Sequence, residues 1–159
     1  MEINSKFVNT ESYFLSENEI KSLKTILDTI KNTQFYHTSS FSDSDLNLLN
    51  KKLGYFPDEY IIPYLDCFRM FLLHPRSNDM FRKMGGGYGE YAKLTELLKR
   101  TSNDNVKTLI LRIFSNLFLN EASRNLLSTK RSELFDILAN LIDSENKTVR
   151  GALVAVFFK

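Results

Sequence analysis

The sequence contains little of several residue types that build common protein classes. Tryptophan is absent, and the 159 residues include only one cysteine, two histidines, three prolines and six glycines. So few glycines and prolines argue against a sandwich or barrel with many tight turns. The single cysteine, Cys67, cannot form an internal disulfide, so nothing in the composition points to an oxidising compartment.

Targeting and membrane signals are also missing. The first residues, MEINSKFVNTESYF, lack the basic and apolar regions of a secretory signal. No apolar run approaches the roughly 18 to 20 residues that a membrane helix requires. With 43% hydrophobic residues, the chain has enough apolar material for one core. We therefore expect a soluble domain in the cytoplasm, with the nucleus as a second location and no membrane partner.

Helix signals recur along the chain, whereas strand signals hardly appear. Ser16 with Glu19, and Ser42 with Asp45, have the spacing of capping boxes at helix N-termini. Gly54 suits the position that follows a helix. Further helices are expected over residues 76–84, 88–100, 104–119, 121–128, 130–142 and 145–158. The pattern predicts an all-α fold, either a helical bundle or a superhelical stack of helix pairs, although no fixed-period repeat is visible.

Three prolines divide the most apolar part of the chain, FPDEYIIPYLDCFRMFLLHP at residues 56–75. Proline is tolerated in the first turn of a helix, because its missing N–H would have no partner there in any case. We therefore expect Pro57 to begin a short turn, Pro63 to begin a second helix, and Pro75 to end that helix.

The sequence gives little support for an enzyme, a metal site or a cofactor. Neither His37 nor His74 is placed by spacing as a base for Cys67, and a buried cysteine is usually just a small apolar residue. No Cys/His cluster has the spacing of metal ligands. The glycine-rich run MGGGYGEYAK lacks the Gly-Lys-Ser/Thr of a phosphate loop, and no strand precedes it. We interpret that run as a flexible joint between helices.

Charge is unevenly distributed along the chain. Residues 1–67 contain six Lys/Arg and ten Asp/Glu, whereas residues 68–159 contain fifteen and nine. A basic second half favours an acidic partner, such as a carboxylate-rich peptide or a nucleic acid, although an ordinary solvated surface explains it equally well. Lys130 and Arg131 form only a basic pair without interleaved aromatic residues, so we expect no nucleic-acid partner.

One predicted helix, NVKTLILRIFSNLFLN, separates its residues into two faces. One face carries apolar residues at helical spacing, namely Ile110, Ile113, Phe114 and Leu117. Arg112 and Asn116 share another face. Helical solenoids present peptide-binding grooves in this way. Two solvated polar residues would give the same pattern, so the spacing leaves both interpretations open.

Arg69 lies in a stretch that is otherwise almost entirely apolar. An unpaired guanidinium in such surroundings would be costly, but Asp66 lies three residues earlier, within reach on the same helix face. One interpretation is a local ion pair at the margin of the core. The other is an arginine that Asp66 steadies and that binds a partner's carboxylate or carbonyl. These residues alone favour neither interpretation.

The last segment, RGALVAVFFK, is a strongly apolar helix with no polar helix after it. Stacks of helices normally finish on a polar outer face. We therefore expect either that part of the stack is missing or that this face meets a partner, including a second copy of the chain through residues 145–158.

Residues 56–81 carry an ordered set of short motifs. These are an aromatic-Pro pair, a second Pro, Leu-Asp, an arginine and His-Pro, at Phe56-Pro57, Pro63, Leu65-Asp66, Arg69 and His74-Pro75. This order resembles the PUL domain, the C-terminal module of the phospholipase A-2-activating protein family. The segment LRIFSNLFLNEASRNLL is similar to the same family's Leu-Arg-x-Phe-x-Asn-x-Phe helix. The likeness covers about residues 15–159, and residues 1–14 are expected to form a flexible tail.

The resemblance implies an armadillo-like superhelical stack of helix pairs that binds a peptide without catalysis or cofactor. The implied ligand is the acidic C-terminal tail of the AAA ATPase segregase, valosin-containing protein, in ubiquitin-dependent protein degradation. The family's groove arginine falls at Arg69, next to Asp66. A role for Arg112 and Asn116 in contacting the tail is inferred from the helical wheel.

This chain departs from the family pattern at its end, because the family domain continues with further helices that this sequence lacks. We therefore expect a C-terminally truncated version of the domain. An alternative function follows from the apolar last segment: a helical scaffold or oligomerisation fragment whose exposed C-terminal helix packs on a partner.

Overall fold

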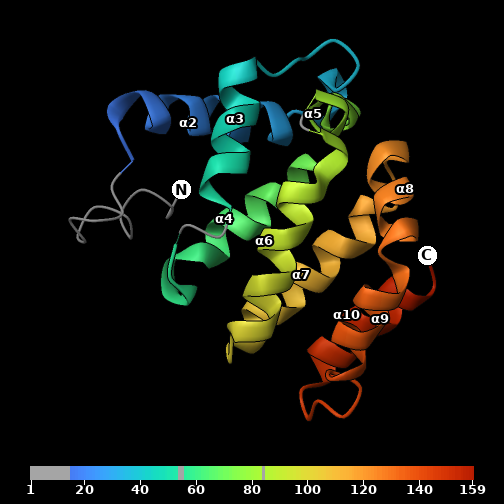
Figure 1. Cartoon of the computed structure of the whole chain (residues 1–159). Coiled ribbons are helices and arrows are strands. Elements are labelled where there is room, and N and C mark those ends of the chain that lie inside the picture. The colour runs from blue at the N-terminus through green and yellow to red at the C-terminus, as the bar shows by residue number, and fades with distance from the viewer. Residues whose placement is uncertain (1–14, 54–55, 84) are drawn as a thin grey trace.

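The structure, a computed structural model, describes residues 15–53, 56–83 and 85–159. Every regular element in those residues is helical (Figure 1), so the all-α prediction is confirmed. The elements are α2 Glu17–Lys31, η1 Thr33–Phe35, α3 Asp43–Lys52, α4 Asp58–Phe71, α5 Ser77–Lys83, η2 Gly85–Gly87, α6 Tyr88–Arg100, α7 Asp104–Leu117, α8 Glu121–Thr129, α9 Arg131–Ala139 and α10 Lys147–Phe157. The predicted tail over residues 1–14 and the predicted helix end at Gly54 lie outside the described residues.

The helices fall into three successive groups, α2–α4, α5–α7 and α8–α10. Helix α5 packs on α8, α6 packs on α9, and α7 lies between α4 and α10. Corresponding helices of the second and third groups therefore lie next to each other, as do α4 and α7, which makes the molecule a helical stack (Figure 1). Its core runs along α7, whose predicted apolar face is fully buried at Ile110, Ile113, Phe114 and Leu117.

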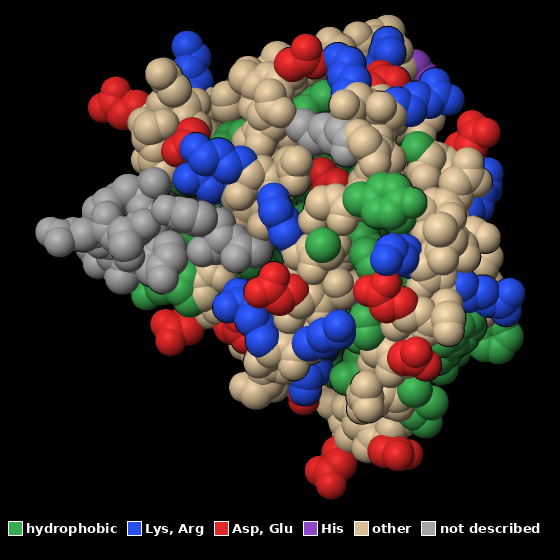
Figure 2. Space-filling model, in the orientation of Figure 1, with side chains coloured by type: hydrophobic (Ala, Val, Ile, Leu, Met, Phe, Trp, Pro, Cys, Tyr) green, Lys and Arg blue, Asp and Glu red, His purple; other side chains and the backbone are tan. Residues whose placement is uncertain are grey.

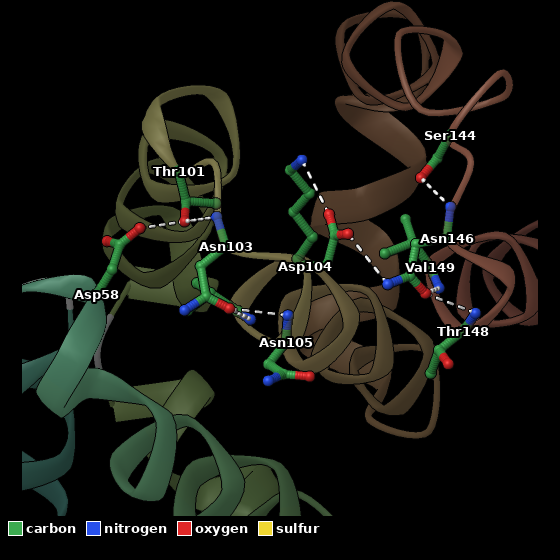
Figure 3. Close-up of polar contacts among 11 residues, drawn as sticks. Asp58, Thr101, Asn103, Asp104, Asn105, Ser144, Asn146, Thr148 and Val149 are labelled. Atoms are coloured by element: carbon green, nitrogen blue, oxygen red, sulfur yellow. Dashed lines mark hydrogen bonds and ion pairs between the residues drawn. The ribbon is translucent and has the colours of Figure 1, made fainter.

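Polar side chains fix the starting ends of the three central helices (Figure 3). The Thr101 hydroxyl, just before α7, donates a hydrogen bond to Asp58 at the start of α4. One group later, the Asn146 side-chain amide, at the N-cap of α10, donates to the Asp104 carboxylate at the start of α7 (3.0 Å). Each junction thus joins an acidic first-turn residue to a polar residue that precedes the next helix.

The other ends of these helices are joined as well. The Asn116 side-chain amide donates to the Arg69 carbonyl near the end of α4 (3.0 Å). The Ser115 hydroxyl donates to the Ala155 carbonyl near the end of α10 (3.4 Å). Because the N-terminal ends of these helices are joined to each other, and the C-terminal ends likewise, α4, α7 and α10 pack in parallel.

The structure shows an internal repeat that the sequence analysis did not find. Asn103 and Asn146 are N-caps 43 residues apart, and each accepts hydrogen bonds from backbone N–H groups in the following turn. Val106 and Val149 occupy equivalent buried positions three residues after these caps. The spacing lies within the 40 to 47 residues, roughly, of armadillo and HEAT repeats.

Residues 58–71 form one helix, so the prediction of a short turn at Pro57 followed by a new helix at Pro63 is wrong. Pro57 is the N-cap of α4 and Pro63 is its sixth residue. Pro63 removes one backbone hydrogen bond, which typically costs about 3 kcal/mol in a helix interior. Burial of α4 against α2 and α7 offsets that cost, because Ile61 and Leu65 are completely buried. Tertiary packing therefore overrides the local signal of proline.

Candidate functional site

The four predicted binding residues lie on two helices that pack side by side. Asp66 and Arg69 belong to α4, and Arg112 and Asn116 belong to α7. The hydrogen bond from the Asn116 amide to the Arg69 carbonyl brings the two pairs into contact. These four residues are called the α4–α7 face below.

Arg69 and Asp66 form an ion pair along α4. The Nε and Nη2 atoms of Arg69 lie 2.8 and 2.7 Å from the same oxygen, Oδ1, of Asp66. The Arg69 side chain is partly buried and Asp66 is half exposed. The pair is therefore at the margin of the core, where Asp66 holds one edge of the guanidinium and orients it.

Asn116 has a structural role at the end of α4. The last turn of α4 tightens, since the Leu73 N–H donates to the Met70 carbonyl (3.1 Å). The Arg69 carbonyl then accepts its hydrogen bond from Asn116 on α7. The amide nitrogen of Asn116 is thus engaged within the stack, and its Oδ1 atom is the group that can accept a hydrogen bond from a ligand.

Arg112 differs from Arg69 in its surroundings. It lies one helical turn before Asn116 and is exposed. Within the described part of the chain, its guanidinium makes no hydrogen bond or ion pair. The α4–α7 face therefore combines one oriented, paired guanidinium with one that is free.

A nucleophilic role for Cys67 has no support in the structure. Cys67 is buried, and burial raises the pKa of its thiol to about 12. The thiolate, which is the reactive form, is thus scarce near neutral pH. Groups of three or more potential metal ligands are absent from the described residues.

His74 and Ser39 lie in contact but do not form a catalytic pair. The Nδ1 atom of His74 accepts a hydrogen bond from the Arg76 N–H (3.1 Å), so the ring proton sits on Nε2. Nε2, 2.9 Å from the Ser39 hydroxyl, is then a donor and cannot take the hydroxyl proton. Burial, with the nearby Arg76 and His37, lowers the pKa of His74 and keeps the ring neutral.

The glycine-rich run forms the junction between α5 and α6. Gly85, Gly86 and Gly87 all have positive φ angles, which residues with side chains rarely adopt. A Cβ atom on Gly87 would lie only 2.7 Å from the ring of Phe81. The run is therefore a helix–helix joint, as predicted, and its glycines serve backbone geometry and close packing.

The end of the stack carries a feature that sequence reasoning missed. A pocket of about 320 Å³ lies between α8, α9 and α10. At its edge the Arg131 guanidinium lies over the Phe135 ring (5.4 Å to the centroid), and that ring stacks on Phe157 (5.4 Å, 17° between planes). The spacing of Arg131 and Phe135, four residues apart on one helix, is the signal that could have found it.

The apolar surface expected at the end of the chain is present. Val154 and Phe158 are exposed on α10 and directly after it. In Figure 2, hydrophobic side chains gather at the lower right edge of the molecule, where Figure 1 places α9 and α10, and Lys/Arg side chains lie beside them. No helix of the described residues is long and apolar enough to cross a membrane.

The comparison with known families agrees with this architecture. A family model for the PUL domain matches residues 1–158, nearly the whole chain. PUL domains are helical modules that bind other proteins, and they are not a family of catalysts. The helical stack, the inert Cys67 and the polar α4–α7 face are all compatible with such a module. The chain belongs to the PUL domain family.

Proposed function

We propose that this protein is a non-catalytic module that docks the acidic C-terminal tail of the AAA ATPase segregase, valosin-containing protein, in ubiquitin-dependent protein degradation. The observation that carries the proposal is the α4–α7 face, where the Asn116 amide on α7 contacts the backbone of Arg69 on α4 and each helix contributes one arginine, in a PUL-family domain. The proposal places the protein in the cytoplasm and in the nucleus.

The chemistry of this face suits an acidic peptide. Arginine stays charged at all physiological pH values and offers a planar fork of donors that matches a carboxylate. Arg112 is free to bind one carboxylate, and Arg69, held by Asp66 through one edge, presents its remaining donors to another. Asn116 Oδ1 accepts from a backbone N–H of the bound tail, so the peptide would lie across α4 and α7.

The expected size of each contribution follows from the type of contact. Hydrogen bonds to charged groups contribute about 1.5–3 kcal/mol, which corresponds to roughly 10- to 100-fold in affinity. Arg112 is more exposed than Arg69, so we expect its contribution to lie nearer the lower limit. Affinity should fall as salt is raised, because exposed charges are screened.

The test is a titration of a fluorescent peptide that copies the segregase tail. We expect Arg69→Ala and Arg112→Ala each to weaken binding about tenfold or more. Arg100→Ala is the matched control, since Arg100 is an exposed arginine at the end of α6, and it should leave the affinity unchanged. Helicity by circular dichroism should be the same in all four proteins.

Two results would contradict the proposal. If a well-folded wild-type chain does not bind the peptide, the tail is not its ligand. If the peptide binds but all three variants bind equally, the α4–α7 face is not the site. Anisotropy at two salt concentrations distinguishes a charge-dependent contact from apolar adhesion of the labelled peptide.

A second role is favoured by a separate observation, the exposure of Val154 and Phe158. In this role the protein is a helical scaffold whose last helix packs on a partner. Polar substitutions at Val154 or Phe158 should then abolish partner binding, and Arg69→Ala should not affect it. The two roles use different helices and can be tested independently.

A further inference from the structure

Glu90 is a buried carboxyl group that is not satisfied inside the protein. It lies in the first turn of α6 and is only 1% exposed. Neither of its side-chain oxygens has a hydrogen-bond partner among the described residues. Buried polar side chains are nearly always hydrogen-bonded, and a buried unpaired charge costs even more. Glu90 therefore requires an explanation that the proposed docking does not supply.

The surroundings of Glu90 are the buried face of α6 and a contact between α6 and α3. Leu94 and Leu97 follow Glu90 at helical spacing and are also buried. Lys93, one turn after Glu90, donates hydrogen bonds to the carbonyl oxygen of Asn50 (2.7 Å) and to its side-chain oxygen (3.1 Å). Because Asn50 belongs to α3, Lys93 ties the second group of helices to the first.

Burial determines which protonation state of Glu90 is favoured. A carboxylate loses its hydration when it is buried, so burial raises the pKa of the group. The backbone N–H groups at the start of α6 and the positive charge of Lys93 oppose this effect. Burial is the largest effect, and the pKa of Glu90 is raised above its ordinary value of 4.5.

The other charged groups around the start of α6 are engaged with each other. Element η2 and residues 113–117 at the end of α7 contain no charged residue. On the remaining neighbouring elements the charged side chains form ion pairs, namely Lys83 with Asp43, Arg82 with Glu121, Lys51 and Lys52 with Glu19, and Lys130 with Glu133. Lys93 is therefore the cation that acts on Glu90.

From the unpartnered buried carboxyl group and this one nearby cation, we infer that Glu90 is held as a neutral acid and that Lys93 is a proton-controlled tie between α6 and α3. While Glu90 is protonated, Lys93 stays on Asn50. When Glu90 releases its proton to solvent, the buried carboxylate requires a counter-charge, and Lys93 moves from Asn50 to it. The first two groups of helices then lose this contact. The inference is independent of the proposed docking, because none of these residues belongs to the α4–α7 face.

The stability of the fold should then decrease as the pH rises. Above about pH 4.5 the unfolded chain has released the proton of Glu90, whereas the folded chain keeps it until the pH reaches the raised pKa. The contribution of Glu90 is thus fully present below this interval, is lost through it and is level above it. One proton changes the unfolding equilibrium constant by at most about tenfold per pH unit.

The test compares urea unfolding of the full wild-type chain and of Glu90→Gln from about pH 4.5 to about pH 8. Glutamine has the shape of the protonated acid but cannot ionise. We expect the unfolding constant of the wild type, divided by that of Glu90→Gln, to rise by up to about tenfold per pH unit and then to become level. The ratio removes contributions that both chains share, including that of His74. Glu96→Gln is the matched control, since Glu96 is an exposed glutamate of the same helix, and it should keep the wild-type dependence.

Two further measurements test the role of Lys93. In Lys93→Met an ionised Glu90 has no counter-charge, so the rise of the ratio should move to higher pH, with Lys93→Met/Glu90→Gln as the reference chain. Amide hydrogen exchange reports on the contact itself. Exchange at the end of α3 and in the first turn of α6 should become faster in the wild type than in Glu90→Gln as Glu90 ionises.

Three results would overturn the inference. A ratio of unfolding constants that does not depend on pH would show that the folded chain does not retain the proton of Glu90. A rise that Lys93→Met leaves at the same pH would show that Lys93 does not serve the carboxylate. If Glu90→Gln does not fold, carbon-13 spectra of glutamate-labelled wild type decide. One carboxyl resonance should titrate above the ordinary range, and its absence would contradict the inference.

Discussion

The two ends of the helical stack are finished in different ways. At the first end, α4 is covered by α2 and by the segment before α3, where Phe41 packs on Phe71. At the other end, the outer side of α10 is open and carries Val154, Phe157 and Phe158 at the surface. The same kind of helix is therefore closed by its own chain at one end and left uncovered by the described residues at the other.

The closed end depends on polar groups that are matched inside the protein. Lys52, almost completely buried, lies 3.2 Å from the Glu19 carboxylate. Partial burial raises the pKa of Glu19, but hydrogen bonds from the Ser16 backbone and from Lys52 together bring the pKa below its usual value. The buried Tyr64 hydroxyl donates to the Leu48 carbonyl (3.0 Å). Each group is satisfied locally, as buried polar groups require.

Among the residues that the structure describes, the open end has no comparable polar closure. An end that is sealed by its own chain has its hydrogen bonds completed before any partner arrives. At the open end, exposed aromatic rings instead lie beside a pocket lined by Arg124, Arg131 and Lys159.

The largest predicted effect compares two phenylalanines that are equivalent by the repeat. Phe114→Ala should cost about 3–5 kcal/mol of unfolding free energy, because it empties a fully buried site beside Tyr91. Phe157→Ala, 43 residues later, should cost only about 1 kcal/mol, since that ring is 40% exposed and loses chiefly its stacking on Phe135. Urea unfolding of both variants measures the difference.

Equal losses of unfolding free energy in Phe114→Ala and Phe157→Ala would contradict this prediction. Equal losses would mean that Phe157 is buried in solution, for example by self-association. Repeating the unfolding at several protein concentrations separates these cases, because a self-associated protein gains stability as its concentration rises. The cost of Phe114→Ala should not depend on concentration.

A smaller effect is expected at the junction that begins α10. Asn146→Ala removes the N-cap bonds to Thr148 and Val149 as well as the bond to Asp104, and should cost about 1–2 kcal/mol. Asn146→Asp keeps the cap but sets a carboxylate against Asp104. Adding Asp104→Asn to that variant should restore part of the loss, and no recovery would show that the junction contributes little. Thermal unfolding provides the measurement.

Much of this architecture could be predicted from local sequence. The capping boxes at Ser16 and Ser42 are both formed as expected, because each signal depends only on residues three positions apart. The single helix across Pro63 could not be predicted, since burial against two other helices decides it. The 43-residue repeat was present in the sequence but was hidden, because only the cap and a few apolar positions are shared.

The candidate site was predictable to a similar extent. Spacing placed Asp66 beside Arg69 and Arg112 above Asn116, and these relations hold within single helices. The hydrogen bond from Asn116 to the Arg69 carbonyl joins residues that are 47 positions apart, and spacing within single helices does not predict it. Likewise, Phe135 and Phe157 stack across two helices, and only the folded structure shows this contact.

The smallest predicted effect concerns His74, whose ring contacts the segment before α3 at the closed end of the stack. Its ring lies between Tyr36 and Phe41 and bonds to Ser39, and burial lowers its pKa below the ordinary value of 6.5. Below about pH 6.5 the unfolded chain binds a proton that the folded ring does not, so stability should decrease as the pH falls through this range and stay level above it. One such group contributes at most about 1.4 kcal/mol per pH unit. Urea unfolding between pH 5.5 and 7.5, with Glu90→Gln in every chain to remove the opposite contribution of Glu90, should show this slope with both histidines present and in His37→Gln, and lose it in His74→Gln. A slope that persists in His74→Gln would show that another group titrates. In that case His74 does not make the stability of the closed end depend on pH.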